Sequence, residues 1–273
     1  MQFDLELRAK PVLKWAGGKS GPLAQMLAHF PTEFNRYVEP FLGGGAVFFA
    51  LKPGVPALLA DSNPELVRLY EVLREEPQEL MAQLDTMAAA YSESYYYDLR
   101  QATPNDRVGL AARTVFLNKT GFNGLFRLNS KGGFNVPFGK RPVCPALYER
   151  ENVLAVSQRL AGAKLVCADF ESVLSETGPG DFAYCDPPYE PLSRTSAFNS
   201  YVAGGFSQDD QTRLEKACAA AVARGARVAV SNSTAPFIAS LYQGWTVQTI
   251  QAKRAINSKG ANRGAIAELL ALR

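Results

Sequence analysis

The sequence contains very little histidine and cysteine. Its single histidine, His29, has no second histidine as a metal partner, and its four cysteines are scattered without a CxxC pair. A zinc site or a Ser-His-Asp triad is therefore not expected, and such thiols are typical of a reducing compartment. No apolar run is long enough to cross a membrane, and the segment Met1 to Lys14 lacks the apolar core of a signal peptide. We therefore expect a cytoplasmic protein that binds no metal and no membrane.

Two common nucleotide-binding motifs are also missing. The segment Gly17-Gly18-Lys19 does not have the GxxxxGK[ST] spacing of a phosphate loop, which argues against an NTPase. The later turn Phe41-Leu42-Gly43-Gly44-Gly45 reads FxGxG rather than GxGxxG. A pyrophosphate-containing cofactor, and with it a nucleotide-dependent oxidoreductase, is therefore not favoured.

What the sequence does contain is an alternation of strand and helix patterns. With 273 residues, 47% of them hydrophobic and 20% charged, it can form one large domain or a domain with an insertion. Strand-like apolar runs occur at residues 37–39, 56–60, 164–168, 182–185, 227–231, 245–250 and 265–271. Helical patterns occur at residues 23–30, 46–51, 65–74, 75–90, 95–102, 107–118, 209–224 and 237–242. The alternation predicts an α/β fold with helices on both faces of the sheet. It stops between about residues 75 and 160, which predicts an inserted domain there and a main domain formed by residues 1–74 and 161–273.

The stretch Asp186-Pro187-Pro188-Tyr189 follows the apolar run 182–185, so it lies where α/β sheets bind ligands. The Asp186 carboxylate and the Pro187 carbonyl are both acceptors and can hold both hydrogens of one exocyclic amine. The ring of Tyr189 offers a surface for stacking a planar base, and the prolines restrict φ before any ligand binds. Such a tetrapeptide can also be a simple turn. We interpret it as a site for an amino-purine or amino-pyrimidine.

The glycine turn at residues 43–45 indicates a cofactor site. Glycines between a strand and a helix let the backbone approach a ligand closely. Asp61 ends the next apolar run, where such sheets bind ribose hydroxyls. This order predicts an adenosine-containing cofactor. Trp15 and Lys19, beside the earlier glycine pair, are candidates to hold a small anionic ligand, or they belong to an ordinary turn before a helix.

Residues 119–141 are polar, basic and rich in glycine. The centre Asn129-Ser130-Lys131-Gly132-Gly133 predicts a hairpin turn with arms at 125–129 and 134–138. Residues 107–150 hold eight Lys and Arg against one acid, which favours contact with nucleic acid over a merely solvated surface. Arg127 and Asn129 should point to the same side, as a guanine-reading and an adenine-reading side chain. Residues 192–205 are a candidate closing loop, and residues 251–263 a candidate phosphate-contacting loop.

Taken together, these motifs resemble those of a known family. The segments are Leu13 to Lys19, Glu39 to Gly45, Asp61 to Pro64, the hairpin Asn123 to Pro137, Asp186 to Tyr189, Pro191 to Ser193 and Arg254 to Ser258. In this order they are similar to the alpha-class Dam-type DNA adenine-N6 methyltransferases, which include methylases of GATC-specific restriction systems. The resemblance implies a Rossmann-like sheet that binds S-adenosylmethionine, with an inserted helical and β-hairpin domain that recognises DNA. It also implies methyl transfer to adenine N6 in double-stranded DNA, within GATC.

The resemblance also assigns residues. It places Trp15 and Lys19 at the methionine end of the cofactor, Asp61 at the ribose, and Asp169 and Phe170 at the adenine. The full cofactor set is Trp15, Lys19, Phe41, Gly43, Gly45, Asp61, Asp169, Phe170 and Asp186. The DNA-binding set, with the basic Lys140 and Arg141 added, is Lys14, Phe122, Asn123, Leu125, Arg127, Asn129, Pro137, Lys140 and Arg141. The catalytic set is Asp186, Pro187 and Tyr189.

The implied mechanism flips the target adenine out of the duplex. It stacks on Tyr189, while Asp186 and the Pro187 carbonyl accept hydrogen bonds from N6 and direct its lone pair toward the methyl group. Two other hypotheses stay open: an amino-methyltransferase acting on cytosine N4 or RNA, and a DNA-binding module without activity. We also expect a cognate restriction endonuclease that acts separately, and association with the nucleoid through DNA.

Overall fold

The computed structural model describes residues 9–15, 17–19, 21–52, 54–129, 132–192, 205–253 and 265–273. The chain divides into two compact units, each assembled from separate stretches of sequence. The first unit comprises Met1–Gly18, Gly43–Val55 and Asn63–Cys167. The second comprises Lys19–Leu42, Pro56–Ser62 and Ala168–Arg273. The predicted site residues are therefore distributed over both units.

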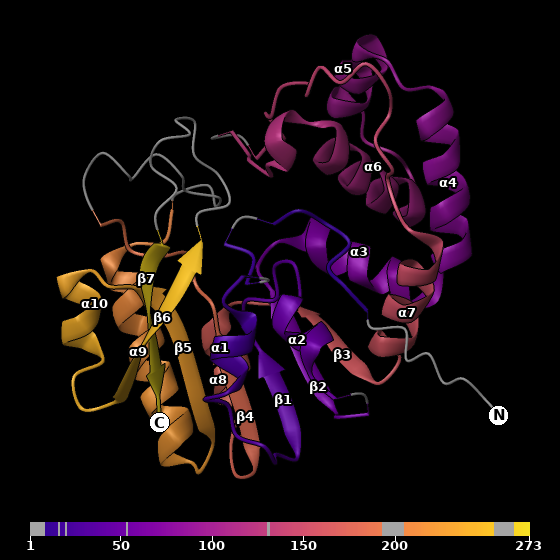
Figure 1. Ribbon diagram of the computed structural model, residues 1–273. Coiled ribbons are helices and arrows are strands. Elements are labelled where there is room, and N and C mark those ends of the chain that lie inside the picture. The colour runs from indigo at the N-terminus through magenta and orange to yellow at the C-terminus, as the bar shows by residue number, and fades with distance from the viewer. Residues whose placement is uncertain are drawn as a thin grey trace. The chain divides into compact units, whose positions relative to one another are not determined.

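Six described strands of the second unit form a mixed sheet (Figure 1). Four of them are parallel neighbours in the order β2 (Ala57–Asp61), β1 (Arg36–Glu39), β4 (Asp181–Cys185) and β5 (Arg227–Ser233). The sheet continues with β7 (Ala265–Leu272) and then β6 (Thr246–Lys253), and β7 is antiparallel to both of its neighbours. Since parallel strands end at the same edge, the residues after β1, β2 and β4 are brought close together.

The strand β4 lies in the core of this unit, and all five of its residues are buried. Side chains alternate along a strand, so Phe182 and Tyr184 face one side of the sheet. Phe30, just after α1 (Leu23–Leu27), contacts both rings at centroid distances of 5.0 and 5.3 Å. Cys185 faces the other side, where its sulfur lies 3.8 Å from that of Cys218 in α9 (Gln208–Ala223). Both faces are covered, as the sequence predicts.

Two helices of the second unit, α8 and α9, begin at polar caps. The Asp169 side chain accepts a hydrogen bond at the start of α8 (Phe170–Ser175), a helix that the sequence analysis did not anticipate. Ser207 and Asp210 form a reciprocal capping box at the start of α9. The short helix α10 (Pro236–Leu241) starts at a proline, which suits a first helical position. These caps determine where the chain turns from strand to helix beside the candidate site.

The first unit is mainly helical. Its elements are α2 (Ala46–Ala50), α3 (Pro64–Glu75), α4 (Pro77–Ala89), α5 (Glu93–Gln101), α6 (Arg107–Thr120), the 3-10 turn η1 (Phe122–Gly124), α7 (Arg150–Leu160) and β3 (Ala163–Cys167). Pro77 separates α3 from α4, because proline lacks the N–H that a continuous helix requires. The sequence analysis missed α7, whose apolar positions Val153, Val156 and Leu160 are buried at helical spacing.

The predicted hairpin is present, but it is not a regular ladder. Isolated bridges pair Leu128 with Phe134 and Gly121 with Phe138. These two bridges have registers that differ by three residues, and the 3-10 turn η1 takes up the difference. The sequence showed the turn residues and the alternating apolar positions, but it did not show this shift, which depends on how the base of the hairpin joins α6.

No helix in the described part of the chain is long and apolar enough to cross a membrane. Most of the candidate closing loop at residues 192–205 lies outside the described residues, as does the phosphate-contacting loop at 251–263 apart from its first residues. Ser130 and Lys131 of the predicted hairpin turn also lie outside them. The candidate site residues that are described lie at strand ends and helix caps of the second unit and, separately, in the glycine turn and the hairpin arms of the first.

Candidate active site

The Asp186 carboxylate lies directly after β4 and has a defined partner on each oxygen. The Lys19 ammonium is 2.7 Å from Oδ2, and the Ser231 hydroxyl is 2.7 Å from Oδ1. Ser231 lies on β5, and its hydroxyl is also 2.9 Å from the Tyr184 hydroxyl. Lys19 is only 3% exposed, so its charge is matched by the carboxylate rather than by water. This carboxylate is held in one orientation before any substrate binds.

The Tyr189 ring lies beside the same ion pair. The Lys19 ammonium is 4.8 Å from the centre of the ring, and the Tyr189 hydroxyl donates a 2.8 Å hydrogen bond to Glu268 on β7. Burial, together with the negative charge of Asp186, raises the pKa of Tyr189 well above its usual value, so its hydroxyl stays a neutral donor. Burial also raises the pKa of Glu268, while Lys19 opposes that shift. The ring is fixed at both its face and its hydroxyl.

The proline pair is held from α9 and β5. Gln211 of α9 donates to the Pro188 carbonyl at 2.9 Å, and its side-chain oxygen accepts from Asn232 of β5 at 3.0 Å. Asn232 also accepts from the Glu190 backbone N–H at 3.1 Å. Gln211 and Asn232 are fully buried. Because buried amides with several partners resist rotation, the peptide after Pro188 has a defined direction.

A second cluster, of aromatic rings, lies next to the ends of β1 and β2. The ring of Phe41 stacks on that of Phe170 at 5.4 Å, and Phe206 contacts both, at 5.8 and 5.7 Å. Asp61 ends β2, and its carbonyl accepts from the Ala168 N–H at 3.2 Å, so it lies close to the start of α8. We call Phe41, Phe170 and Phe206 the aromatic cluster. Rings beside a carboxylate suit a flat, amine-bearing heterocycle.

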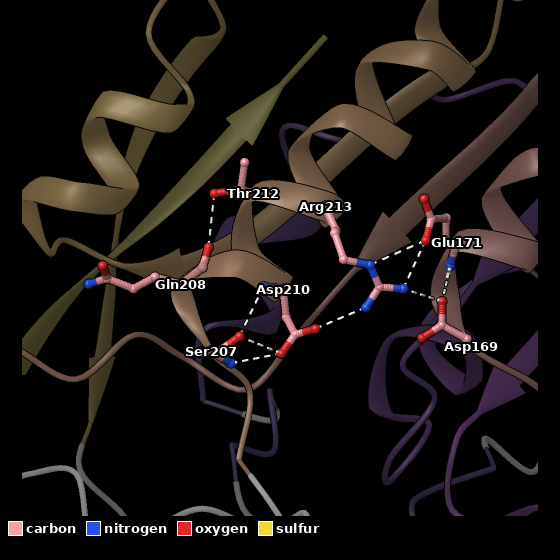
Figure 2. Close-up of polar contacts among 7 residues, drawn as sticks. All are labelled: Asp169, Glu171, Ser207, Gln208, Asp210, Thr212 and Arg213. Atoms are coloured by element: carbon pink, nitrogen blue, oxygen red, sulfur yellow. Dashed lines mark hydrogen bonds and ion pairs between the residues drawn. The ribbon is translucent and has the colours of Figure 1, made fainter.

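The carboxylate beside the aromatic cluster is Asp169, and Figure 2 shows its surroundings. Its Oδ1 accepts from the Glu171 backbone N–H at 2.9 Å and from Arg213 of α9 at 3.1 Å. Arg213 also bonds the Glu171 carboxylate at 2.8 Å and Asp210 at 2.9 Å (Figure 2). Asp169 and Phe170, which are adjacent in sequence, therefore present a carboxylate and a ring from one helix start.

The glycine turn belongs to the first unit, where it packs against Trp15. Gly43 and Gly45 have φ angles of 47° and 69°, which favour glycine. A Cβ on Gly43 would lie 2.8 Å from the Trp15 ring, and one on Gly45 would lie 2.8 Å from the Phe49 ring. The Trp15 ring also contacts Phe126 at 5.0 Å. In this turn the glycines thus permit a left-handed backbone and close side-chain packing.

Most of the hairpin residues predicted to bind DNA are exposed to solvent. Those classed as exposed are Phe122, Asn123, Arg127, Asn129, Pro137, Lys140 and Arg141, and Leu125 is half-buried. The side chains that alternate with them are buried: Phe126, Phe134, Val136 and Phe138. Lys14 lies under the hairpin base, where Asn118 bonds its backbone N–H and carbonyl at 3.0 and 2.9 Å. The structure therefore brings this set together on one scaffold.

The polar groups of the hairpin bond mainly to one another. Arg127 donates to the Asn135 side chain at 2.7 Å, and the Asn129 side chain accepts from the Gly133 N–H at 2.9 Å. The basic segment is less open than its composition indicates. Arg113 is buried and bonds the Leu99 carbonyl, and Lys119 is half-buried, which lowers its pKa. Arg127, Lys140 and Arg141, by contrast, are exposed.

Several residues of the site were not found from the sequence. They are Ser231, Asn232 and Glu268 on strands, and Phe206, Gln211 and Arg213 at α9. Polar residues in β5 and β7, which otherwise read as apolar strands, were the available signal, because buried polar groups need partners. Phe206 and Arg213 carried no such signal, because a ring before a helix and a basic residue within it are both common.

A family model for the D12 class N6 adenine-specific DNA methyltransferases matches residues 15–256. The chain belongs to this family. The Type II methyltransferase M1.LlaDCHI of Lactococcus lactis subsp. cremoris is 37% identical over 273 residues, which cover 97% of this chain and 95% of that protein. The Type II methyltransferase M.MjaIII of Methanocaldococcus jannaschii is 38% identical over 278 residues, covering 94% and 96%. A DNA adenine methylase of Vibrio cholerae is 37% identical over 272 residues, covering 97% and 96%.

As a member of the D12 class, this enzyme methylates N6 of adenine in DNA. The expected family and methyl transfer to adenine N6 of DNA are thereby confirmed, and the mixed sheet with its helices confirms the α/β class. The chemistry agrees with the geometry at the end of β4. An adenine N6 amine has two hydrogens to donate, and Asp186 offers a carboxylate that is held rigidly next to the Tyr189 ring. Among the described residues no group of three or more His, Cys, Asp or Glu side chains could hold a metal ion.

Proposed function

We propose that this DNA methyltransferase uses S-adenosylmethionine to methylate the adenine of GATC in double-stranded DNA, with the target base flipped out of the helix. The observation that carries the proposal is the Asp186 carboxylate fixed between Lys19 and Ser231, at the end of a buried strand and beside the Tyr189 ring. This arrangement supports an exocyclic amine as the nucleophile, because the carboxylate oxygens next to the ring are hydrogen-bond acceptors.

The residues of the second unit fit the proposed cofactor. The aromatic cluster can contact its adenine ring, and the Asp169 carboxylate can accept from the adenine amine. Asp61, next to the start of α8, can accept from ribose hydroxyls. We retain Trp15 and Lys19 as proposed contacts of the methionine end, and Gly43 and Gly45 as the turn that lines the cofactor. When bound, S-adenosylmethionine supplies an electrophilic methyl group on a sulfonium.

Positioning the amine is the main task of the chain's own residues. Each oxygen of Asp186 already accepts one hydrogen bond or ion pair, and a carboxylate has about four acceptor positions, so it can also accept from N6. The Pro187 carbonyl takes the second N6 hydrogen, which directs the nitrogen lone pair away from both acceptors. Tyr189 stacks on the flipped base. Flipping costs a few kcal/mol, and a preorganised site compensates because it needs no rearrangement during the reaction.

Recognition of the sequence is proposed for the hairpin. Arg127 suits guanine and Asn129 suits adenine in the major groove, and both are exposed on the same arm. Leu125 and Pro137 are proposed as further base contacts, with Lys14. Phe122 and Asn123 are proposed to lie near the flipped base or the gap it leaves, and Lys140 and Arg141 to contact phosphates. We keep the proposal that residues 75–160 are the DNA target-recognition domain inserted between residues 1–74 and 161–273.

The biological setting is a further part of the proposal. Two relatives are named type II methyltransferases, and for this chain we propose a cognate restriction endonuclease that acts as a separate protein. A DNA substrate would place the enzyme in the cytoplasm at the nucleoid. Protection of host GATC sites from cleavage by a GATC-specific nuclease, in cells that express this enzyme alone, is the outcome expected for that setting.

The decisive experiment measures transfer of labelled methyl from S-adenosylmethionine to a duplex with one GATC site. A matched duplex with GTTC in its place is the control. We expect label in the first duplex alone, and on adenine after hydrolysis to nucleosides. Label in both duplexes would retain the reaction and reject the GATC assignment. Label in neither, with cofactor still bound, would reject GATC as the recognition sequence, and duplexes with other sequences, single-stranded DNA and RNA would be assayed next.

A further inference from the structure

The guanidinium of Arg213 contacts three carboxylates and one aromatic ring. It bonds Asp169 at 3.1 Å, Glu171 at 2.8 Å and Asp210 at 2.9 Å, and its central carbon lies 4.9 Å from the centre of the Phe170 ring (Figure 2). Two of these partners, Asp169 and Phe170, are the residues proposed to bind the adenine of the cofactor. Arg213 itself comes from another helix, α9.

On the α8 side, Arg213 restrains the Asp169 carboxylate. The bonds from Arg213 and from the Glu171 backbone N–H both go to Oδ1. They orient the carboxylate so that its other oxygen, Oδ2, can accept from an exocyclic amine. The Asp169 side chain is 53% exposed. With only the hydrogen bond from the Glu171 N–H, a carboxylate so exposed to water would rotate among several rotamers. The second donor at the same oxygen, Arg213, reduces that freedom.

On the α9 side, the same guanidinium restrains the aromatic cluster. Asp210, its third partner, also accepts from the Ser207 backbone N–H at 2.9 Å and from the Ser207 hydroxyl at 2.8 Å (Figure 2). Ser207 directly follows Phe206, whose ring contacts Phe41 and Phe170. Arg213 therefore links the start of α8 to the start of α9. Phe170 is the first residue of α8, and Phe206 directly precedes the cap of α9.

We propose that Arg213 is a positioning residue for the adenine end of the cofactor. It acts through Asp169 and Phe170 and does not itself touch the ligand. The inference rests on the proposed use of S-adenosylmethionine and deepens it, because it names the residue that sets the preference for an amine at position 6 of the purine. Replacing Arg213 should weaken cofactor binding through Asp169 and leave the geometry around Asp186 intact.

The alternative is that Arg213 forms only a surface ion-pair network, since such pairs usually contribute little to stability. The chain offers a matched control in Arg107, which lies in the first unit and pairs with Glu75 and Glu76. The exposed fractions of the two side chains are similar, 43% for Arg213 and 45% for Arg107. Arg107 is not among the residues proposed to bind cofactor, base or phosphate. Arg107→Ala should therefore remove a comparable network without affecting ligand selection.

The test uses calorimetric binding of two ligands, the reaction product S-adenosylhomocysteine and its deaminated analogue S-inosylhomocysteine. The proteins are the full-length wild type, Arg213→Ala, Arg213→Lys and Arg107→Ala. We expect the wild type to prefer the adenosyl compound, because the carboxylate of Asp169 repels a carbonyl oxygen at position 6. Arg213→Ala should weaken adenosyl binding about tenfold, the size of one charge-assisted hydrogen bond, and inosyl binding by much less. Arg213→Lys should recover part of the loss, and Arg107→Ala should match the wild type.

Steady-state kinetics provide the second measurement. For Arg213→Ala we expect KM for S-adenosylmethionine to rise about tenfold, while kcat and KM for DNA stay near wild type. Three results for Arg213→Ala would overturn the role of Arg213 while leaving the proposed function standing. They are an equal loss of affinity for both ligands, an unchanged affinity for both, and a loss confined to kcat. A wild-type protein that methylates DNA but binds the adenosyl and inosyl ligands equally well would also overturn the role of Arg213. A wild-type protein that binds neither of these ligands nor S-adenosylmethionine would overturn the proposed function together with this inference.

Discussion

The segment after β4 and the hairpin at residues 121–139 both present polar side chains, but they hold them in different ways. Asp186 is paired with Lys19 and Ser231, which are distant in sequence and nearly buried. In the hairpin, Arg127 and Asn129 are exposed and bond residues only a few positions away. The first arrangement resists any change of geometry. The second leaves its side chains accessible to a partner and is supported from below by buried rings.

This contrast matches two separate demands of the enzyme. A reacting amine must be positioned closely, because small errors in geometry reduce the rate strongly. Base reading requires side chains that can give up local hydrogen bonds to water or to one another in exchange for base edges. Substitutions in the two regions should accordingly have different consequences for turnover, stability and specificity.

The largest effect is expected from Asp186→Ala. It removes an acceptor of the amine, so turnover should fall by about 10²- to 10³-fold or more. It also removes the ion pair between Asp186 and the buried Lys19 ammonium, so the free energy of unfolding should fall by about 1–3 kcal/mol. Single-turnover methylation and thermal unfolding measure the two effects. The Asp186→Asn variant is the control: it keeps an oxygen near Ser231 and should lose activity with a similar cost in stability. A rate close to wild type in either variant would contradict the mechanism.

The next effect concerns the support of the hairpin. The Phe134 ring is 7% exposed and packs on Phe126 at a centroid distance of 5.5 Å. Phe134→Ala should cost about 3 kcal/mol of stability, the lower end of the range for a buried Phe, because the hairpin can partly collapse. DNA binding should weaken with it. Denaturant unfolding and a DNA-binding titration measure the two effects. Val143→Ala, at a side chain that is 71% exposed, should leave both within error.

An exposed reading residue should behave in the opposite way. Arg127→Ala should leave the free energy of unfolding within about 0.5 kcal/mol of wild type. It should reduce discrimination at one base pair of the site by about 1–3 kcal/mol. Methylation rates on GATC and on duplexes with one substituted base pair measure this. An equal fall in methylation rate on all duplexes would identify Arg127 as a phosphate contact. A large fall in the free energy of unfolding would remove the contrast with Asp186.

The smallest effect is a pH dependence from Glu268. Burial raises its pKa above the ordinary value of 4.5, so the folded protein binds a proton more readily than the unfolded chain. Its contribution to stability is therefore full below pH 4.5 and is lost as pH rises through the higher folded pKa. Glu268→Gln cannot titrate, so the difference in unfolding free energy between the variant and wild type should change over this window. A difference that is constant between pH 4 and 8 would contradict a raised pKa. Glu33→Gln, at an exposed carboxylate, is the control.

Much of the fold followed from local patterns. Apolar runs ending in Glu39, Asp61 and Cys185 became parallel strands. The glycine motif follows the first of these strands, and the proline motif follows the last. Helices α7 and α8 were missed. The apolar spacing of α7 was a signal that could have been found, since Val153, Val156 and Leu160 recur at helical intervals. The helix α8 has only six residues, which is too few to show a period. The shift of register in the hairpin was also missed, because it depends on how its base joins α6.

The sequence alone determined the kind of chemistry, since an acid, two prolines and an aromatic ring after an apolar strand place acceptors and a stacking surface at one sheet edge. It also determined the alternation of buried rings and exposed polar groups in the hairpin. Only the tertiary structure decided which residues hold those groups in place: Lys19 and Ser231 on Asp186, Glu268 on Tyr189 and Arg213 on Asp169. The physical reason is that such partners come from distant segments. A buried charge or hydroxyl is satisfied by whatever group the packing of the sheet brings within about 3 Å, and no local pattern encodes that choice.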